Sequence, residues 1–234
     1  MEDKSWDRVL SGVHELAEEF PEGMVLIGGV AVWFHSKKLS DERLLMMSHD
    51  VDCFLSTVDF GTLREYDEVI ENRRLGKFQV IRSGVDFDIY VERRNGLVVP
   101  YEDVQRKSVV LDGVRCASTA HLLVLKIEAY MDRKTSVKGH KDALDIIKIL
   151  MLIATQYRYA KVEYEDIMHT SQEGLDAISG IAKDSALYYE ISKKNRHDAS
   201  IMRKLATDGL KLVLSSYSGT STDSADPSHG VLCQ

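Results

Sequence analysis

The stretch Met24-Val25-Leu26-Ile27-Gly28-Gly29 decides the fold of this chain. Four consecutive apolar residues followed at once by two glycines predict a short buried strand that turns sharply. Residues 30–35 then predict a helix. Such a turn exposes backbone amides at the helix N-terminus, where a phosphate can bind. The chain geometry alone also explains the glycines, because glycine adopts positive φ without strain.

Working outward, Asp50-Val51-Asp52-Cys53-Phe54-Leu55 predicts a second strand. Side chains alternate along a strand, so Asp50 and Asp52 share one face. Two adjacent carboxylates repel each other, and a divalent cation removes that repulsion. Oxygen ligands of this kind suit magnesium. Taken alone, the pair also fits a strand edge in contact with water.

A later stretch, Val85-Asp86-Phe87-Asp88-Ile89-Tyr90-Val91, predicts a further strand in which Asp86 and Asp88 share a face. It forms a hairpin with the predicted strand at 78–82, through a turn at Ser83-Gly84. An acid among apolar residues needs a partner if it is buried, and a shared metal would supply one. The alternative is an edge strand whose acidic face lies in water.

The rest of the chain completes a mixed pattern. Trp6 to Phe20 has helical periodicity, and Asp59 is a candidate N-cap for a helix reaching about Asn72. Asp112-Gly113 predicts a second hairpin, and Ser118 can cap a helix that reaches about Asp132.

We therefore expect an α/β (α+β) fold, with a mixed sheet flanked by helices and a helical C-terminal region. The predicted domains are 1–117 and 118–215, followed by a disordered Ser- and Thr-rich tail at 216–234.

Composition limits the classes of protein that fit. The 234 residues are 44% apolar and 29% charged, which is typical of a globular domain. A net charge of −7 argues against a surface devoted to nucleic acid, although a local basic cleft remains compatible with it. The three cysteines have no CxxC spacing, and no apolar run approaches the roughly 18 residues of a spanning helix. These features indicate a cytoplasmic protein.

The order of motifs resembles the minimal nucleotidyltransferases of the polymerase-β-like superfamily. The shared features are the strand with Gly28-Gly29, the strand Ser48-His49-Asp50-Val51-Asp52, and Asp88 on a later strand. In detail the chain is similar to the abortive-infection toxin nucleotidyltransferases of type IV toxin–antitoxin systems. The likeness extends over about residues 20–155, including the helix that carries Lys126 and the segment Arg133 to Asp145.

The resemblance implies a role for each candidate residue. Asp50, Asp52 and Asp88 would be the catalytic carboxylates that bind two Mg²⁺ or Mn²⁺ ions, with Asp86 as the competitor for the third position. The residues implied to bind the triphosphate are Gly28, Gly29, Ser48, Lys126 and Lys141. The alternative for the two lysines is a solvated helix face.

The implied reaction moves a nucleoside monophosphate from an NTP to a hydroxyl group. The acceptor would be RNA such as tRNA, a protein, or a small molecule such as an antibiotic. A toxin would also have an antitoxin partner. The alternatives are a non-catalytic binding or regulatory module on the same fold, and a phosphohydrolase with an aspartyl nucleophile.

Overall fold

The computed structural model describes residues 4–38, 50–156 and 161–218. Its centre is a seven-stranded mixed sheet with the order β3-β4-β5-β2-β1-β7-β6. β2 is parallel to β5 and β1 is parallel to β7, whereas the other neighbouring pairs are antiparallel. The strands are β1 (Met24–Ile27), β2 (Asp50–Leu55), β3 (Val69–Asn72), β4 (Lys77–Arg82), β5 (Val85–Val91), β6 (Val109–Leu111) and β7 (Val114–Cys116).

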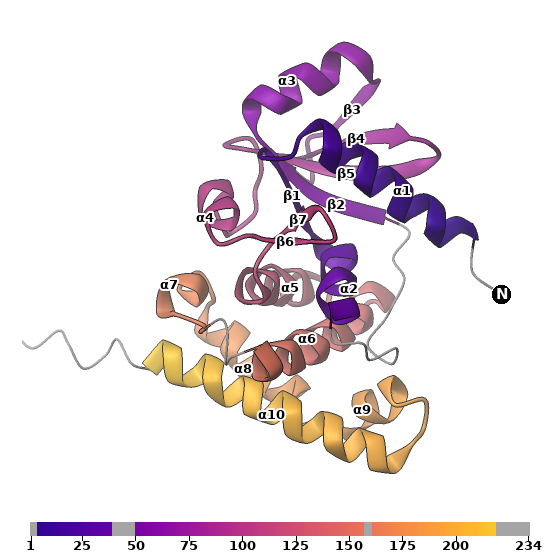
Figure 1. The fold of residues 1–234 in the computed structure, drawn as a ribbon. Helices are drawn as coiled ribbons and strands as arrows, with labels where there is room; N and C mark the ends of the chain where they lie inside the picture. Colours follow the sequence, from indigo (N-terminus) through magenta and orange to yellow (C-terminus); the bar gives the residue numbers. More distant parts are fainter. Residues whose placement is uncertain (1–3, 39–49, 157–160, 219–234) are drawn as a thin grey trace, which may run out of the picture.

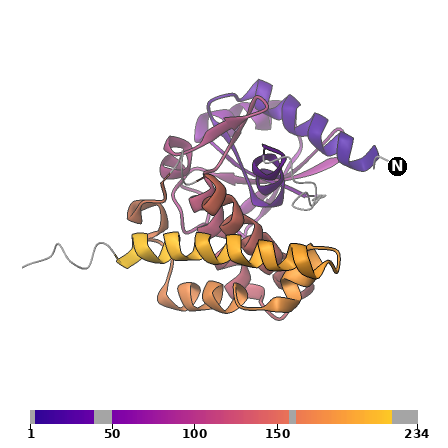
Figure 2. The ribbon, with the colours of Figure 1, turned by 60° about the horizontal axis from the view of Figure 1, so that its bottom comes forward.

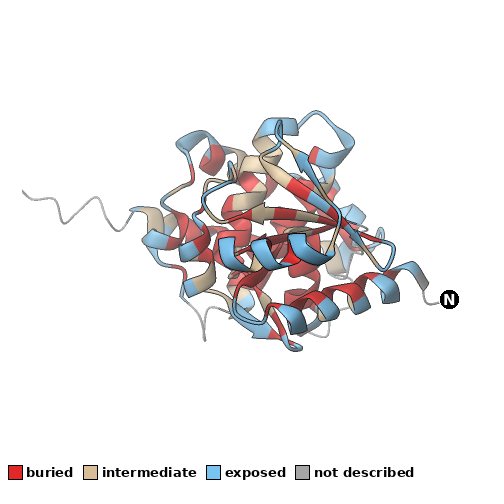
Figure 3. Ribbon diagram, turned by 90° about the horizontal axis from the view of Figure 1, so that it is seen from above, coloured by how far each residue is buried: buried red, intermediate tan, exposed pale blue. Residues whose placement is uncertain are grey.

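Two helices, α1 (Lys4–Glu19) and α3 (Thr57–Tyr66), cover one face of the sheet. Phe60 of α3 packs against Phe78, with ring centroids 4.5 Å apart, and α1 lies against Phe87 on the same face. The inward sides of these helices are buried and their outward sides are exposed (Figure 3). The aspartates of β2 and β5 therefore point to the opposite face.

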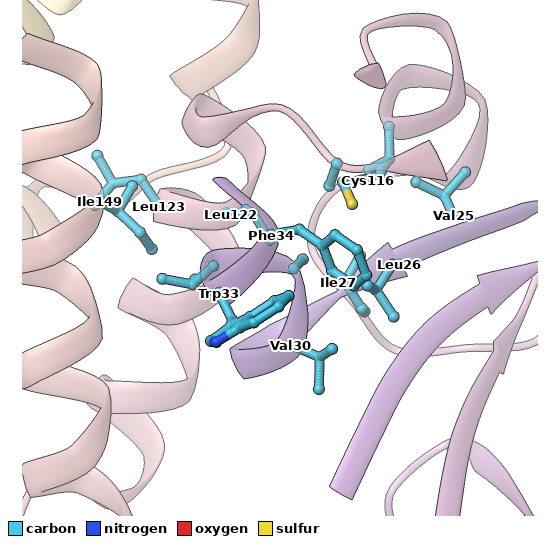
Figure 4. Packing of buried hydrophobic residues seen from close by; sticks show 14 of the residues in the cluster. Val25, Leu26, Ile27, Val30, Trp33, Phe34, Cys116, Leu122, Leu123 and Ile149 are labelled. Carbon is cyan, nitrogen blue, oxygen red and sulfur yellow. The ribbon is translucent and has the colours of Figure 1, made fainter. Parts of the chain in front are cut away.

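Helix α2 (Gly28–Lys38) connects the sheet to the helical part of the chain. Its side chains Trp33 and Phe34 are buried, and their ring centroids lie 5.1 Å from that of Trp6 and 5.9 Å from that of His14, respectively, both on α1. The helix also packs against α5 (Thr119–Arg133) and α6 (Val137–Gln156), from which Leu123 and Ile149 are drawn in Figure 4. One continuous apolar core thus joins the two parts of the molecule, which orients the sheet relative to α5.

The helical part is built around α6, which is buried almost continuously from Asp142 to Ile153. The long helix α10 (Arg196–Ser218) lies along α6 (Figure 2). Shorter helices complete the layer: α7 (Tyr164–Ile167), α8 (Gln172–Ile181) and α9 (Ser185–Ile191) (Figure 1). Helix α4 (Tyr101–Arg106) instead packs beside the sheet, where the ring of Tyr101 lies 5.9 Å from that of Phe54. Within the described ranges, no helix is long and apolar enough to cross a bilayer.

The predicted fold class is confirmed, as are both hairpins. Ser83 and Gly84 have φ of 52° and 74°, and Asp112 and Gly113 have φ of 50° and 80°. Two residues with positive φ are the signature of a type I′ turn, which fits the twist of the flanking strands. The Ser118 side chain accepts a hydrogen bond from the His121 amide, as expected of an N-cap.

The predicted helix from Asp59 to about Asn72 is wrong at both ends. Ser56 is the N-cap, because its side chain accepts the Asp59 amide hydrogen bond, and α3 ends at Tyr66. The following residues form β3, an edge strand that pairs with β4 and leaves Ile70 57% exposed. Pairing with β4 overrides the helical pattern there, as long-range contacts often do.

The change from strands to helices falls where the sequence places it, between β7 and α5. The division into domains 1–117 and 118–215 stays a prediction. The predicted tail begins at residue 216, but α10 continues through Ser218, and residues 219–234 lie outside the described part.

Close packing of α10 on α6 leads to a stability prediction. A β-carbon on Gly209 would overlap the carbonyl oxygen of Leu150, whereas one on Gly61 of α3 would meet open space. We expect Gly209→Ala to lower the free energy of unfolding by about 2 kcal/mol, because the helices must separate. The matched change Gly61→Ala should raise it by roughly 0.5–1 kcal/mol through better helix propensity. Urea unfolding of both variants tests this, and equal effects would contradict it.

Candidate active site

The parallel pairing of β2 with β5 brings four aspartates together on one face. Asp50 is in register with Asp86, and Asp52 is in register with Asp88. The outer pair is exposed, whereas Asp52 and Asp88 are partly buried. Since residues in register on neighbouring strands point the same way, Asp52 and Asp88 form the inner, shielded pair of the site.

The glycine turn closes against this pair. Ile27, the last residue of β1, is in register with Asp52, so Gly28 begins α2 beside the Asp52 carboxylate. Gly28 has a φ of +68°, and a β-carbon there would overlap the Asp52 side chain. Only glycine satisfies both conditions. The N-terminus of an 11-residue helix therefore lies directly beside a candidate catalytic acid.

The burial of Asp52 raises its pKa from the ordinary 3.8 to about 6. The carboxylates of Asp88 and Asp50 raise the pKa further, whereas Lys126 and Lys77 oppose them. Desolvation and like charge both disfavour the ionised form. The negative charge of the Asp52 carboxylate thus lacks full compensation.

Asp88 is held from the neighbouring strand β4. Lys77 forms an ion pair with its Oδ2 atom, and the amide of Gln79 donates to its Oδ1 atom at 3.2 Å. The Lys77 and Asp88 side chains are only 12% and 15% exposed. Both oxygens of the third carboxylate therefore have partners within the protein.

A buried charge network connects α5 to α6 beneath the site. Lys126 Nζ lies 2.8 Å from Asp145 Oδ2 and 3.3 Å from Asp142 Oδ1. Arg133 donates to both oxygens of Asp142, at 2.8 and 3.1 Å. Although burial lowers the pKa of Lys126, Asp145, Asp142 and Asp52 raise it above its ordinary value. Lys126 is therefore held as an ammonium facing the carboxylates.

Lys148 adds a third cation to these two acids. Its Nζ atom is buried, lies 3.8 Å from Asp145 Oδ1 and has no hydrogen-bond partner in the part of the chain that the structure describes. Burial lowers the pKa of Lys148 to about 8, Asp145 opposes this shift, and Lys126 and Lys141 lower the pKa further. Three basic side chains therefore share two carboxylates in this network.

The donor set suits a hard divalent cation. In the described residues no three His, Cys, Asp or Glu side chains are already grouped around one point as ligands. Even so, Asp52 carries partly uncompensated negative charge next to Asp88, and Asp50 lies two residues away on the same face. Carboxylate oxygens in this arrangement are the ligands that Mg²⁺ and Mn²⁺ prefer.

The structure brings together most of the predicted residues. Asp50, Asp52, Asp88, Gly28 and Lys126 lie at one site, with the backbone of Gly29 following in the first turn of α2. Ser48 lies outside the described residues, as does its neighbour His49. Lys141 belongs to α6 and lies close enough to Lys148 to lower that pKa.

Sequence reasoning missed Lys77 and Gln79. The hairpin at Ser83-Gly84 would have revealed both, because it sets Gln79 opposite Asp88 and places Lys77 diagonally across from it. It also missed Lys148, because this residue lies among the apolar residues of α6 and no local pattern indicates its contact with Asp145. Of the two competitors for the third carboxylate, Asp88 lies beside Asp52 and raises its pKa, and Asp86 lies further out, beside Asp50.

No protein-family model matches the sequence, and neither does any curated protein. Among solved structures, the chain is similar to an antigenic nucleotidyltransferase-like protein from Paracoccidioides brasiliensis, at 17% identity over 85% of this chain and 93% of that chain, with a TM-score of 0.47. It is also similar to JHP933 from Helicobacter pylori, at 14% identity over 96% of each chain, with a TM-score of 0.46.

A third similar structure is the Megavirus polyadenylate synthase. The identity is 17% over 69% of this chain and 34% of that chain, and the TM-score is 0.44. Likeness at this level carries no argument about activity, so the function proposed below rests on the site itself.

The raised pKa of Asp52 leads to a pH prediction. The folded protein holds the Asp52 proton up to about pH 6, whereas the unfolded chain releases it near 3.8. The contribution of Asp52 to the free energy of unfolding therefore falls as the pH rises through this window. Asp52→Asn removes that loss, so the variant should match the wild type near pH 4 and exceed it by about 1–3 kcal/mol near pH 7.

Chemical unfolding at both pH values, without divalent cations, measures this difference. Asp86→Asn is the matched control, because it removes an exposed carboxylate from the same face. A pH-independent difference for Asp52→Asn, or an equal gain in the control, would contradict the assignment.

Proposed function

We propose that this protein is a metal-dependent nucleotidyltransferase, which transfers a nucleoside monophosphate from an NTP to a hydroxyl acceptor. The observation that carries the proposal is the meeting of three features at one point. These are the Asp52–Asp88 pair in parallel register, the α2 N-terminus that begins at Gly28 against Asp52, and the Lys126 ammonium whose charge acts on Asp52. Nucleotidyl transfer requires metal-binding carboxylates, backbone amides that bind an anion, and a positively charged side chain.

Asp50, Asp52 and Asp88 are the proposed metal-binding carboxylates. A bound Mg²⁺ or Mn²⁺ ion would stabilise the negative charge that develops on the phosphate oxygens during transfer. The partial burial of Asp52 and Asp88 strengthens their hold on a cation, because charges interact more strongly where water is excluded. In this proposal Asp88 would bind the metal near the acceptor hydroxyl and help to deprotonate that hydroxyl.

The remaining residues bind the triphosphate in this proposal. The first amides of α2, at Gly28 and Gly29, donate to phosphate oxygens, and the positive end of the helix dipole attracts the anion. Lys126 contributes a fixed positive charge, because Asp142 and Asp145 hold it in place from below. Ser48 and Lys141 remain proposed partners of the same group.

The acceptor we favour is RNA such as tRNA, or a protein, in line with the resemblance to abortive-infection toxins. On this proposal the helical region after residue 117 contacts the acceptor, and a separate antitoxin protein controls the activity.

The test is label transfer from each α-labelled NTP, with Mg²⁺ present, to total RNA, to cellular protein and to the enzyme itself. We expect label in one acceptor class with the wild type. The double variant Asp50→Asn, Asp52→Asn should lose transfer by at least about 1,000-fold, because the cation that offsets the phosphate charge is gone. Asp88→Asn should also lose it, whereas Asp86→Asn should retain it.

The outcomes separate the alternatives. Transfer that survives in the double variant would contradict the assigned site. Magnesium-dependent NTP binding without transfer to any macromolecule would indicate a small-molecule acceptor. A folded wild-type protein with neither NTP binding nor transfer would exclude the enzyme and favour a non-catalytic module. Since Asn at position 52 is expected to stabilise the fold, unfolding would not explain a loss of activity.

A further inference from the structure

We propose that Lys77 is a built-in cation of the site, so that the nucleotide-free protein binds one divalent cation, at Asp50 and Asp52, instead of two. This rests on the proposed function, since it takes the carboxylates of β2 and β5 as the metal-binding set. It adds a positioning residue from β4, a strand that carries none of the candidate catalytic residues.

The first support is the saturation of Asp88. Lys77 pairs with Oδ2 of this carboxylate, and Gln79 donates to Oδ1 at 3.2 Å. A second divalent cation at Asp88 would have to compete with both donors. Among residues 4–38, 50–156 and 161–218, no lysine is comparably hydrogen-bonded to Asp52, because Lys126 is committed to Asp142 and Asp145 and acts on Asp52 only through its charge.

The second support is the environment of the pair. Lys77 and Asp88 are 12% and 15% exposed, whereas the side chains of another lysine–aspartate pair, Lys37 and Asp112, are 51% and 53% exposed. Exposed pairs are screened and rearrange freely. Separating a shielded pair instead leaves a charge without compensation, which is strongly unfavourable. Lys77 is therefore difficult to displace.

The third support is the backbone register. Gln79 is directly opposite Asp88 in the β4–β5 ladder, and Lys77 lies two residues away on the same face. The hairpin turn at Ser83-Gly84 sets this register. The pairing of β4 with β5 therefore fixes the position of the Lys77 ammonium.

Replacing Lys77 with a neutral residue removes the ammonium from Asp88 and opens that carboxylate to a second cation.

The experiment measures Mn²⁺ binding to the full-length protein without nucleotide, by electron paramagnetic resonance of the free ion and by calorimetry. We expect one ion per chain for the wild type and two for Lys77→Met, with the second site at least about tenfold tighter than any second site of the wild type. Lys77→Arg, which keeps the charge, should bind one ion. Lys37→Met removes a lysine from the exposed pair and should also bind one.

The results distinguish this proposal from the function on which it rests. Two ions in the wild type, or one in both wild type and Lys77→Met, would overturn the role of Lys77 and leave the metal site intact. Two ions in Lys77→Arg would likewise overturn it. No Mn²⁺ in any variant, or binding that survives Asp50→Asn, Asp52→Asn, would overturn the metal-dependent function itself. Thermal unfolding checks each variant, and Lys77→Gln replaces Lys77→Met if that protein does not fold.

Discussion

The parallel register between β2 and β5 is the constraint on which the rest of the structure depends. It places Asp52 beside Asp88, and the two carboxylates cannot separate without breaking the centre of the sheet. Lys126 on α5 and Lys77 on β4 offset part of this repulsion, and the α2 N-terminus at Gly28 lies against Asp52. β4 is positioned by its pairing with β5, and α5 by its packing against α6. The site is therefore a property of the whole sheet–helix arrangement.

The helical region is electrostatically part of the site as well as its support. Asp142 and Asp145, both nearly fully buried on α6, orient the bases of α5 toward β2. Burying an ion network of this kind costs desolvation free energy, and the network in return holds each charge at a defined position. The apolar core formed by Trp33, Phe34, Leu123 and Ile149 holds α5 at the correct distance from the sheet.

Much of this arrangement was predictable from local patterns. The alternation in Asp50 to Leu55, the glycines after Ile27 and the two type I′ turns identified the strands, the main turn and the carboxylates. Features that depend on distant partners were not predictable. β3 exists because β4 pairs with it, and Lys126 meets Asp142 and Asp145 only once α5 and α6 fold together. The contact between Lys77 and Asp88 lies between these cases, because hairpin register implies it although neither residue signals it alone.

The contact between Gly28 and Asp52 restricts how this protein can change in evolution. Any side chain at position 28 collides with the carboxylate at position 52, so the first substitution there is harmful while the acid is present. If Asp52 were replaced first by a small residue, the steric barrier at Gly28 would disappear, and only the strain of its positive φ would remain. Descendants that lost the acid could then accumulate larger residues in the turn. Return to an acid at position 52 would afterwards require a second, simultaneous reversion, so the loss would become effectively irreversible.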